Sequence, residues 1–273
     1  MTLRGGTDLI PAERQARILG LVQREGATSV QRVAAILGAS ASTIRRDLDS
    51  LTRSGYLERT HGGAVLRPRL RSTFEPAPDI SARIEHTAKA AIGAAAAALV
   101  EDGQSVILDS SSTVLEAARV LAARDLAITA VTNDLQIAAV MNGAGRARVI
   151  VLGGVVRPGT PTLTGEPGLG FVAGLFADLA LIGIHSLARL RLSDTSVEVA
   201  QMKRGLIRAA RRAVLLADST KFAHPAFCEV CGMDAVAALI SDTGLAPEHA
   251  QAVRQSGVTL TLAAPDGDGP HGG

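Results

Sequence analysis

The sequence contains few of the residues that build disulfide networks, aromatic clusters or membrane spans. Among 273 residues there are two cysteines, one tyrosine and no tryptophan. Two cysteines cannot form a disulfide framework, and the longest apolar run, residues 94–100, is much too short to cross a bilayer. The N-terminal segment MTLRGGTDLI lacks the apolar stretch and the cleavage site of a secretory signal. We therefore expect a soluble cytoplasmic protein with no membrane association.

Motifs that would indicate a cofactor or a metal are also missing. The six histidines do not occur at metal-ligand spacing, and neither a dinucleotide-binding nor a P-loop glycine pattern is present. Cys228 and Cys231 have the spacing of a CxxC motif, but no second pair completes a zinc site. We interpret the two thiols as buried and inert, with a redox or partial metal site as the alternative. The sequence thus predicts no cofactor, no metal and no catalytic residue.

Charge is unevenly distributed along the chain. The net charge is only +2, but residues 1–72 contain 12 basic and 6 acidic residues, whereas residues 73–273 contain 16 and 20. A basic N-terminal part on a mildly acidic body indicates that the two parts bind different partners. On charge alone, chance variation of the surface is the alternative.

Three helices are predicted in the N-terminal part of the chain. The first begins at Pro11, whose missing N–H falls where helix N–H groups are unpaired anyway, and it ends at Gly26. The second ends at Gly38, and Ser40 is a suitable N-cap for the third, which Gly55 closes. Only a short turn separates the second and third helices, and this arrangement is typical of a helix-turn-helix.

The third helix and the segment after it carry the residues that we expect to contact DNA. Because Ile44, Leu48 and Leu51 face inward, the start of this helix presents hydroxyl and guanidinium groups where such helices enter the major groove. Residues 56–60 and 64–66 are predicted to form a two-stranded wing. The candidate DNA-binding residues are Ser40, Ser42, Thr43, Arg45, Arg46, Arg59, His61 and Gly62. A helical hairpin with a solvated arginine face is the alternative.

The rest of the chain alternates between short apolar runs and helical patterns, which predicts a parallel sheet covered by helices. The candidate strands are residues 105–108, 127–131, 149–152, 179–182, 213–217 and 236–240, and the clearest helices are residues 114–122, 134–141 and 198–210. The expected domains are a winged helix-turn-helix at 9–66, a proline-containing linker at 67–80, a sheet domain at 81–263 and a disordered tail at 264–273.

Polar or glycine residues follow four of the predicted strands, at residues 109–113, 132–134, 153–154 and 218–221. Ligands of parallel sheets bind at the carboxyl ends of the strands, and hydroxyls with backbone N–H groups at a helix start suit an anion. Lys203 and Lys221 are two of only three lysines in the chain. Each polar end alone is explained by an ordinary helix cap, but the four together favour a small phosphorylated ligand.

Two series of motifs resemble one family of bacterial regulators. Ser40, residues 43–48, Gly55 and residues 61–64 resemble the DNA-binding domain of DeoR-type transcription regulators. The stretches ILDSSST, VTND, VIVLGGVVR, TLTGE, EVAQMKR and LLADSTKF resemble, in this order, the C-terminal sensor of the same family. The resemblance implies an α/β protein in which an N-terminal winged helix-turn-helix precedes a Rossmann-like, ribose-5-phosphate-isomerase-like sensor domain.

The same resemblance implies a function and an effector site. We expect a repressor of a sugar or polyol catabolic operon that binds double-stranded operator DNA and is relieved by a phosphorylated sugar or related metabolite. The implied effector-binding residues are Asp109, Ser111, Ser112, Thr113, Thr132, Asn133, Gly153, Gly154, Lys203, Asp218 and Lys221. Because one winged helix reads few base pairs, we expect a homo-oligomer, either a dimer or a tetramer.

Two departures from the family bear on the ligand. Ser111 stands where the family usually has glycine, and residues 185–194 contain no glycine where the family has a glycine-rich loop. A sugar-phosphate isomerase with a DNA-binding appendage is the alternative function, with Asp109, Glu198 and Asp218 as candidate bases. The complete DNA-reading helix and wing favour the regulator.

Overall fold

The computed structural model describes residues 9–66, 72, 73, 75–222 and 224–265, and the chain divides into two compact units, residues 1–85 and 86–273. Each unit has its own apolar core. Much of the predicted linker (67–71 and 74) and of the predicted tail (266–273) lies outside the described residues.

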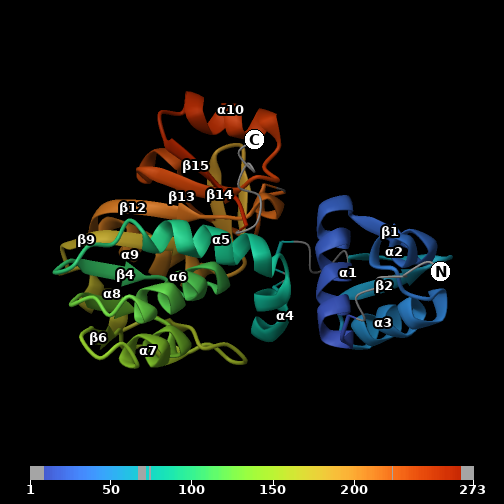
Figure 1. Ribbon diagram of the computed structural model, residues 1–273, viewed down its shortest axis with the longest axis horizontal. Helices are drawn as coiled ribbons and strands as arrows, with labels where there is room; N and C mark the ends of the chain where they lie inside the picture. The colour runs from blue at the N-terminus through green and yellow to red at the C-terminus, as the bar shows by residue number, and fades with distance from the viewer. Residues whose placement is uncertain (1–8, 67–71, 74, 223, 266–273) are drawn as a thin grey trace, which may run out of the picture. The chain divides into compact units, whose positions relative to one another are not determined.

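The first unit contains the predicted helix-turn-helix (Figure 1). Its helices end at the predicted residues. Gly26 and Gly38 adopt the left-handed conformation that glycine allows, and they end the first and second helices. Ser40 caps the third helix by accepting a hydrogen bond from the N–H of Thr43 at 3.1 Å. The elements of this unit are α1 (Pro11–Glu25), β1 (Ala27–Ser29), α2 (Val30–Leu37), α3 (Ala41–Arg53), β2 (Leu57–Thr60), β3 (Gly63–Leu66) and α4 (Pro78–Arg83).

The predicted wing is present as the antiparallel pair β2–β3, and a third strand, β1, pairs with β3. The close approach of β1 requires a glycine at position 63, because a Cβ there would lie 2.0 Å from the carbonyl oxygen of Thr28. The wing is therefore tied to the segment between α1 and α2.

Residues inside the predicted linker form part of the first unit. The helix α4 follows Pro76, and Ile84 just after it is 4% exposed and packs in the same core as Ile18 of α1 and Ile44 of α3. Glu85, the last residue of this unit, has a φ of 52°, so the chain passes from α4 to the next helix through a left-handed residue.

The second unit is built on a seven-stranded sheet in which every neighbouring pair of strands is parallel. In spatial order the strands are β15 (Thr259–Ala263), β14 (Ala238–Asp242), β12 (Ala210–Leu216), β9 (Ala177–Gly183), β4 (Ser105–Leu108), β5 (Thr129–Thr132) and β6 (Arg148–Val151). All six predicted strands are confirmed. The edge strand β15 is an addition that the sequence pattern does not reveal.

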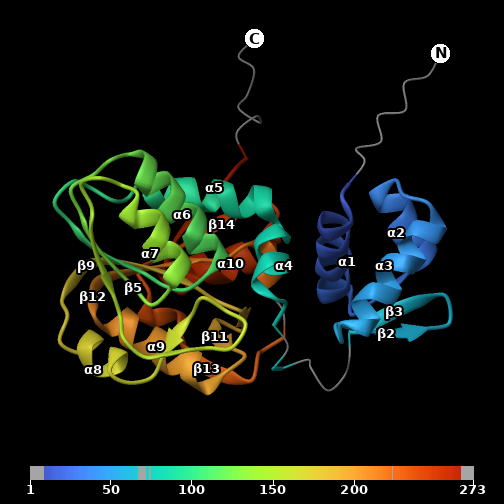
Figure 2. The ribbon, with the colours of Figure 1, turned by 90° about the horizontal axis from the view of Figure 1, so that it is seen from below.

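Helices cover both faces of this sheet, as Figure 2 shows. On one face are α5 (His86–Ala97), α6 (Ser112–Ala123) and α7 (Leu135–Asn142), and on the other are α8 (Gly168–Val172), α9 (Val197–Arg208) and α10 (Pro247–Gln255). Strand residues alternate between the two cores: Val106 and Leu108 pack under α5 and α6, whereas Ile107 packs with α9. The predicted α/β fold class is confirmed.

A small antiparallel sheet lies beside the main one and consists of β10 (Ser186–Ala188), β11 (Arg191–Asp194) and β13 (Cys228–Gly232). The segment without glycine, residues 185–194, thus forms a hairpin. Its two turn residues, Arg189 and Leu190, have φ values of 50° and 60°, as a type I′ turn requires. The turn that glycine usually makes is here made by two residues with side chains.

Candidate DNA-binding face and effector site

The predicted DNA-reading residues lie on the exposed face of α3. Ser42, Arg45 and Arg46 are exposed, whereas Ile44 and Leu48 on the opposite face are fully buried. Asp47 is the polar residue that interrupts the buried face, at 4% exposure. A helix that enters a DNA groove needs exposed polar residues on one face and apolar residues packed in the core on the other, and α3 has this pattern.

Three hydroxyls order the start of α3. Ser40 Oγ accepts a hydrogen bond from the Thr43 N–H and lies 2.8 Å from both Ser42 Oγ and Thr43 Oγ1. Ser40 therefore contacts both of the other hydroxyls. Together with the N-terminus of the helix, they form a group of donors that suits a DNA phosphate.

Asp47 lies within residues 43–48, which carry the family resemblance, but its side chain contacts other residues of the first unit. Its two carboxylate oxygens accept hydrogen bonds from Arg14 of α1, at 2.5 Å from Nε and 3.2 Å from Nη2. The Nε2 group of Gln15 lies 3.4 Å from the same carboxylate. The paired charges therefore connect α3 to α1 within the first unit.

The wing presents a mixed set of predicted residues. His61 and Gly62 are exposed at its tip, and Gly62 has a φ of 89°. Arg59 is partly buried, with its Nε 3.4 Å from Asp49 Oδ1 of α3. Its Nη1 is buried with no hydrogen-bond partner among the described residues. The side chain of Arg59 is therefore less exposed to solvent than those of Arg45 and Arg46.

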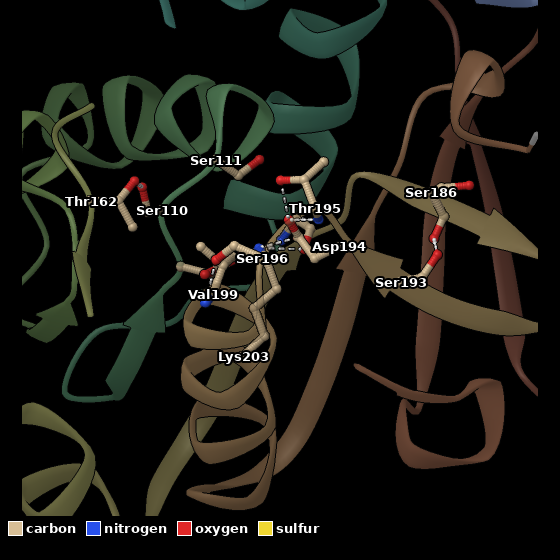
Figure 3. A network of polar contacts seen from close by, with 12 residues as sticks. Ser110, Ser111, Thr162, Ser186, Ser193, Asp194, Thr195, Ser196, Val199 and Lys203 are labelled. Atoms are coloured by element: carbon tan, nitrogen blue, oxygen red, sulfur yellow. Dashed lines mark hydrogen bonds and ion pairs between the residues drawn. The ribbon is translucent and has the colours of Figure 1, made fainter. Parts of the chain in front are cut away.

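At the carboxyl end of the sheet, the predicted residues Asp109 and Lys203 form a buried ion pair. Asp109 follows β4 and Lys203 lies on α9, and they are 1% and 3% exposed. Asp109 Oδ2 accepts hydrogen bonds from Lys203 Nζ and, at 3.0 Å, from the N–H of Gly183 at the end of β9. Lys203 Nζ also donates to the Gly183 carbonyl at 2.9 Å. It lies 3.8 Å from Asp194 Oδ2, and Figure 3 shows these two residues.

Opposing effects act on the pKa of Asp109 in this pair. Burial raises the pKa of Asp109 to about 6, although the charge and the hydrogen bond of Lys203 oppose this shift. A second carboxylate, that of Asp194, adds to the increase. Asp194 is itself 4% exposed and accepts a hydrogen bond from the Thr195 N–H at 2.8 Å. Sequence reasoning missed Asp194, which is the last residue of β11, a strand of the small sheet.

The serine at position 111 is accommodated by a glycine on the neighbouring strand. Ser111 Oγ caps α6 by accepting from the Thr113 N–H at 3.2 Å. A Cβ at Gly183 would lie 2.1 Å from that oxygen. The larger residue therefore fits because its neighbour has no side chain, and it lies close to the carboxylate of Asp109.

The predicted residues at the end of β5 form hydrogen bonds with other residues of the second unit. Thr132 Oγ1 donates to the Leu108 carbonyl at 2.7 Å, and Asn133 Oδ1 accepts from the Ser110 N–H at 3.0 Å. Asn133 Nδ2 also donates to the carbonyl of Leu163 at 3.3 Å. Figure 3 shows Ser110 beside Thr162, and their hydroxyls lie 2.7 Å apart. These contacts hold the strand ends together.

Gly153 and Gly154 also make close backbone contacts. A Cβ at Gly153 would lie 2.8 Å from Pro167 Cγ, and one at Gly154 would lie 2.4 Å from the Thr164 carbonyl oxygen. Residues after Gly154 form β7 (Val155–Val156), which pairs with β8 (Leu163–Thr164). The two glycines therefore allow a hairpin to fold back over the end of β6.

Asp218 marks a second polar group, at the end of β12. It is 1% exposed, and its Oδ1 accepts two hydrogen bonds from Thr220, whereas its Oδ2 is buried with no partner among the described residues. Burial raises the pKa of Asp218, but the charges of Lys221 and Lys89 and the Thr220 hydrogen bonds outweigh it, so the pKa lies below its ordinary value. Lys89 is 1% exposed and lies on α5.

Sequence reasoning missed Lys89. The signal in the sequence is the rarity of lysine: Lys89 is one of only three lysines in the chain, and it interrupts an alanine-rich helix. A lysine is rarely fully buried unless it is paired. Its burial near Asp218 therefore adds a cation to the strand ends.

The predicted effector residues divide into two groups across the sheet. Gly183 of β9 pairs with Leu216, two residues before Asp218, and its N–H donates to Asp109 Oδ2, so β9 lies between the ends of β4 and β12 that carry Asp109 and Asp218. The end of β6, where Gly153 lies, is four strands from β12, or roughly 19 Å at about 4.8 Å per strand. Asp109, at the end of β4, is two strands from β6.

A separate cleft of about 440 Å³ lies between α8 and α9. Its lining includes Phe176, Arg204 and Arg208, and none of the predicted effector residues is among the described residues that line it. In the described part of the chain, no group of three or more His, Cys, Asp or Glu residues is arranged to hold a metal ion. Both cysteines, Cys228 and Cys231, are partly exposed, which corrects the expectation from the sequence that the thiols are buried. The described helices are also all too short or too polar to span a membrane.

An exposed helix-turn-helix and wing, followed by an α/β domain with charged groups at its strand ends, define a transcription regulator with a ligand-sensing domain. The model of the DeoR-like helix-turn-helix domain matches residues 14–69, and the model of the DeoR C-terminal sensor domain matches residues 84–243. The chain belongs to the DeoR family of transcriptional regulators. The helix-turn-helix domain implies DNA binding, and the sensor domain implies a small-molecule effector.

Relatives along the whole chain are regulators of transcription and not enzymes. The chain is 30% identical to an HTH-type transcriptional regulator of Haemophilus influenzae over 93% of this chain and 98% of that protein. It is 28% identical to the HTH-type transcriptional repressor GlcR of Bacillus subtilis over 93% and 97%. Among solved structures, ribose 5-phosphate isomerase A of Methanocaldococcus jannaschii has a TM-score of 0.38 and 17% identity, over 50% of this chain and 54% of that one.

Proposed function

We propose that this protein represses a sugar or polyol catabolic operon in the cytoplasm and binds its operator through α3 and the wing. The observation that carries the proposal is the exposure of Ser42, Arg45 and Arg46 on a helix whose other face is buried. Arginine donates two hydrogen bonds to the edge of a guanine, and serine or threonine hydroxyls form hydrogen bonds with bases or phosphates. Arg45 and Arg46 supply the direct contacts in this proposal. His61 and Gly62 at the wing tip contact the sugar-phosphate backbone of the DNA in this proposal.

We further propose that a phosphorylated sugar or related metabolite binds at the ends of β4, β9 and β12 and relieves repression. The start of α6, with Ser112 and Thr113, supplies backbone N–H groups and a helix dipole for the phosphate. Asp218 Oδ2 supplies a buried acceptor for a sugar hydroxyl, and Lys221 and Lys89 supply positive charge. In this proposal Thr132, Asn133 and the two glycines at 153 and 154 support the site, because their contacts are internal.

A homo-oligomer, dimer or tetramer, is the third part of the proposal. Two winged helices joined by symmetry read two half-sites, whereas one reads few base pairs. The second unit exposes Phe176, which lines the cleft between α8 and α9, at 89%, and Phe171 of α8 at 49%. Exposed aromatic residues beside a cleft are typical of interfaces between subunits.

A melting-temperature screen tests the effector site. The full-length protein is heated with ribose 5-phosphate, glycerol 3-phosphate, other sugar phosphates and inorganic phosphate, and with the matched unphosphorylated sugars as controls. A ligand at 100 times its Kd stabilises the native state by about 2.7 kcal/mol. We expect stabilisation by a phosphorylated compound alone, and we expect the paired change Ser112→Ala with Thr113→Ala to reduce it. Thr261→Ala, on the exposed edge strand β15, is the control. Equal stabilisation by phosphorylated and unphosphorylated sugars would contradict a phosphate site.

Selection from random duplexes tests the DNA-binding face. Arg46→Ala in the full-length protein should cost about 1–3 kcal/mol at the selected site and relax the preference at one base position. Arg59→Ala should weaken all duplexes alike, because Arg59 lies on the wing and pairs with Asp49. The affinity of the wild-type protein should fall steeply between low and physiological salt. The assignment is reversed if Arg59→Ala changes the base preference and Arg46→Ala does not.

A further inference from the structure

A single residue joins the last core residue of the first unit to the first helix of the second. Ile84 packs in the apolar core of the first unit, and α5 begins two residues later at His86. Between them lies Glu85, which has a left-handed φ of 52°, and a Cβ at Gly20 of α1 would lie 3.8 Å from its Oε1. A flexible linker absorbs a movement of one unit, whereas a joint of one residue passes the movement on. A displacement of the start of α5 is therefore passed to α4.

The helices α5 and α6 are held together by close backbone contact. Figure 2 shows α5 and α6 side by side. Near the middle of α5, a Cβ at Gly93 would lie 2.7 Å from the backbone nitrogen of Ala117, so only glycine permits this approach. At the far ends, Arg124 after α6 donates a hydrogen bond to the carbonyl of Ala97, the last residue of α5. Because their backbones are this close, the two helices move together.

The start of α6, where we propose that the phosphate binds, lies one turn from a contact with the first residue of α5. Glu116 is 8% exposed and follows Thr113 by three positions on α6. Its Oε1 accepts a hydrogen bond from Arg119 Nη1 at 2.5 Å and lies 3.8 Å from Nε2 of His86. A change at the first turn of α6 therefore reaches His86 through one helical turn.

Lys89 forms a second connection, between α5 and the end of β12. It is buried and lies three positions after His86. Burial raises the pKa of Asp218, but the charges of Lys221 and Lys89 help to hold it below its ordinary value, so Lys89 lies near that carboxylate. Asp218 Oδ2 is the acceptor that we propose for a sugar hydroxyl, and it has no hydrogen-bond partner among the described residues. Both parts of the proposed effector site therefore act on the first two turns of α5.

On the basis of the effector site proposed above, we propose that the first two turns of α5 transmit effector binding to the DNA-binding unit. A ligand that occupies Asp218 Oδ2 and the start of α6 changes the contacts of Lys89 and His86, and the start of α5 moves. The joint at Glu85 passes this movement to α4 and reorients the DNA-binding unit. Operator affinity then depends on the ligand, and by linkage operator binding changes α5 in return.

Hydrogen exchange of the full-length protein tests this proposal without any effector. A duplex selected from random sequences serves as the operator, and exchange is measured by mass spectrometry with and without it. In the wild-type protein, operator binding should change the protection of peptides that cover residues 86–92 of α5 and 109–116 at the start of α6. Insertion of Gly-Gly-Ser-Gly between Glu85 and His86 should abolish this change, while the variant still binds the operator.

The same insertion in an exposed loop is the control. Gly-Gly-Ser-Gly between Gly145 and Arg146, after α7, should leave the change in α5 in place. If the joint insertion prevents folding, Glu85→Gly loosens the joint without lengthening it and should reduce the change. The proposal is overturned if operator binding leaves α5 unchanged in the wild-type protein, or if the joint variant keeps the wild-type change.

A pair of glycine variants tests the contact between α5 and α6. Gly93→Ala forces the two helices apart, so operator binding should still change α5 but no longer the start of α6. Gly205→Ala on α9 is the matched control, because its Cβ would lie 3.1 Å from Val172 of α8. Circular dichroism confirms that each variant is folded. If Gly93→Ala does not fold, Glu116→Gln removes the charge beside His86 and should weaken the change at α6. A full change at α6 in these variants contradicts transmission through the helix pair.

Sugar phosphates separate a failure of the transmission from a failure of the effector site. If ribose 5-phosphate or glycerol 3-phosphate raises the melting temperature, it should change the operator affinity of the wild-type protein about 5–150-fold. In the joint-insertion variant the same compound should raise the melting temperature equally but change operator affinity less than about twofold. Equal changes of affinity in both proteins overturn the transmission. If neither compound raises the melting temperature, the proposed effector class is wrong, and the exchange comparison alone decides the role of α5.

Discussion

Lys203 on α9 donates a hydrogen bond to the carboxylate of Asp109 at the end of β4, although 94 positions of the sequence separate the two residues. Both side chains are almost fully buried. The contact ties a helix on one side of the sheet to the centre of the strand ends. Because burial raises the pKa of Asp109 against the opposing charge of Lys203, the stability of the protein depends on pH in a direction that is unusual for a carboxylate.

We expect Asp109 to stabilise the protein at low pH. Its pKa is raised to about 6 in the folded state, so its contribution is fully present below its unfolded pKa and is lost as the pH rises through 6. The free energy of unfolding of the wild-type protein, relative to Asp109→Asn, should fall by up to about 3 kcal/mol between about pH 4 and pH 7. Urea unfolding at a series of pH values measures the difference.

Lys203→Met provides a second test of the same pair. The change removes the cation that opposes the shift, so the pH window in which stability is lost should move upward. Parallel pH profiles for the wild type and Asp109→Asn, or a wild-type protein that loses relative stability as the pH falls, would contradict the assignment.

The Arg14–Asp47 pair should contribute to folding and not to base recognition. The two side chains are 12% and 5% exposed, and removing one partner of a buried pair costs about 3–5 kcal/mol. Asp47→Leu should therefore destabilise the first unit, and Arg14→Met with Asp47→Leu should recover part of the loss. Urea unfolding followed in the full-length chain measures both. If Asp47→Leu keeps full stability but changes the preferred DNA sequence, the internal role is wrong.

Two adjacent glycines in the wing separate a packing requirement from a conformational one. Gly63→Ala places a Cβ 2.0 Å from the Thr28 carbonyl oxygen, so β1 and β3 must separate. We expect a loss of about 2 kcal/mol or more, together with weaker DNA binding. Gly62→Ala meets no atom within 4 Å but keeps a φ of 89°, which costs about 1–2 kcal/mol. Equal costs in thermal unfolding would contradict the tight pairing of β1 and β3.

The proposed oligomer can be tested at Phe176. Light scattering on the wild-type protein at micromolar concentration should give a dimer or tetramer, and Phe176→Ser should shift the mass toward the monomer. Phe227→Ser, which removes another exposed phenylalanine at 59% exposure, is the control. A monomeric wild-type protein, with and without DNA, rules out the oligomer. An unchanged mass for Phe176→Ser places the interface elsewhere.

The sequence alone determines the local architecture of this protein. Gly26, Gly38 and Ser40 stop and start helices through their own backbone preferences and hydrogen bonds, so the helix-turn-helix is visible without tertiary contacts. Apolar runs of strand length predict six of the seven strands of the main sheet, because both faces of a parallel sheet are buried. The strand ends then supply candidate site residues.

Only the tertiary structure decides what those residues do. Whether Asp47 contacts DNA or Arg14, whether Asn133 contacts a ligand or Ser110, and whether Lys89 is solvated or buried depend on segments that are far apart in the sequence. Local preferences depend on neighbours in the chain, whereas burial, pairing and pKa depend on which distant groups the packed fold brings together.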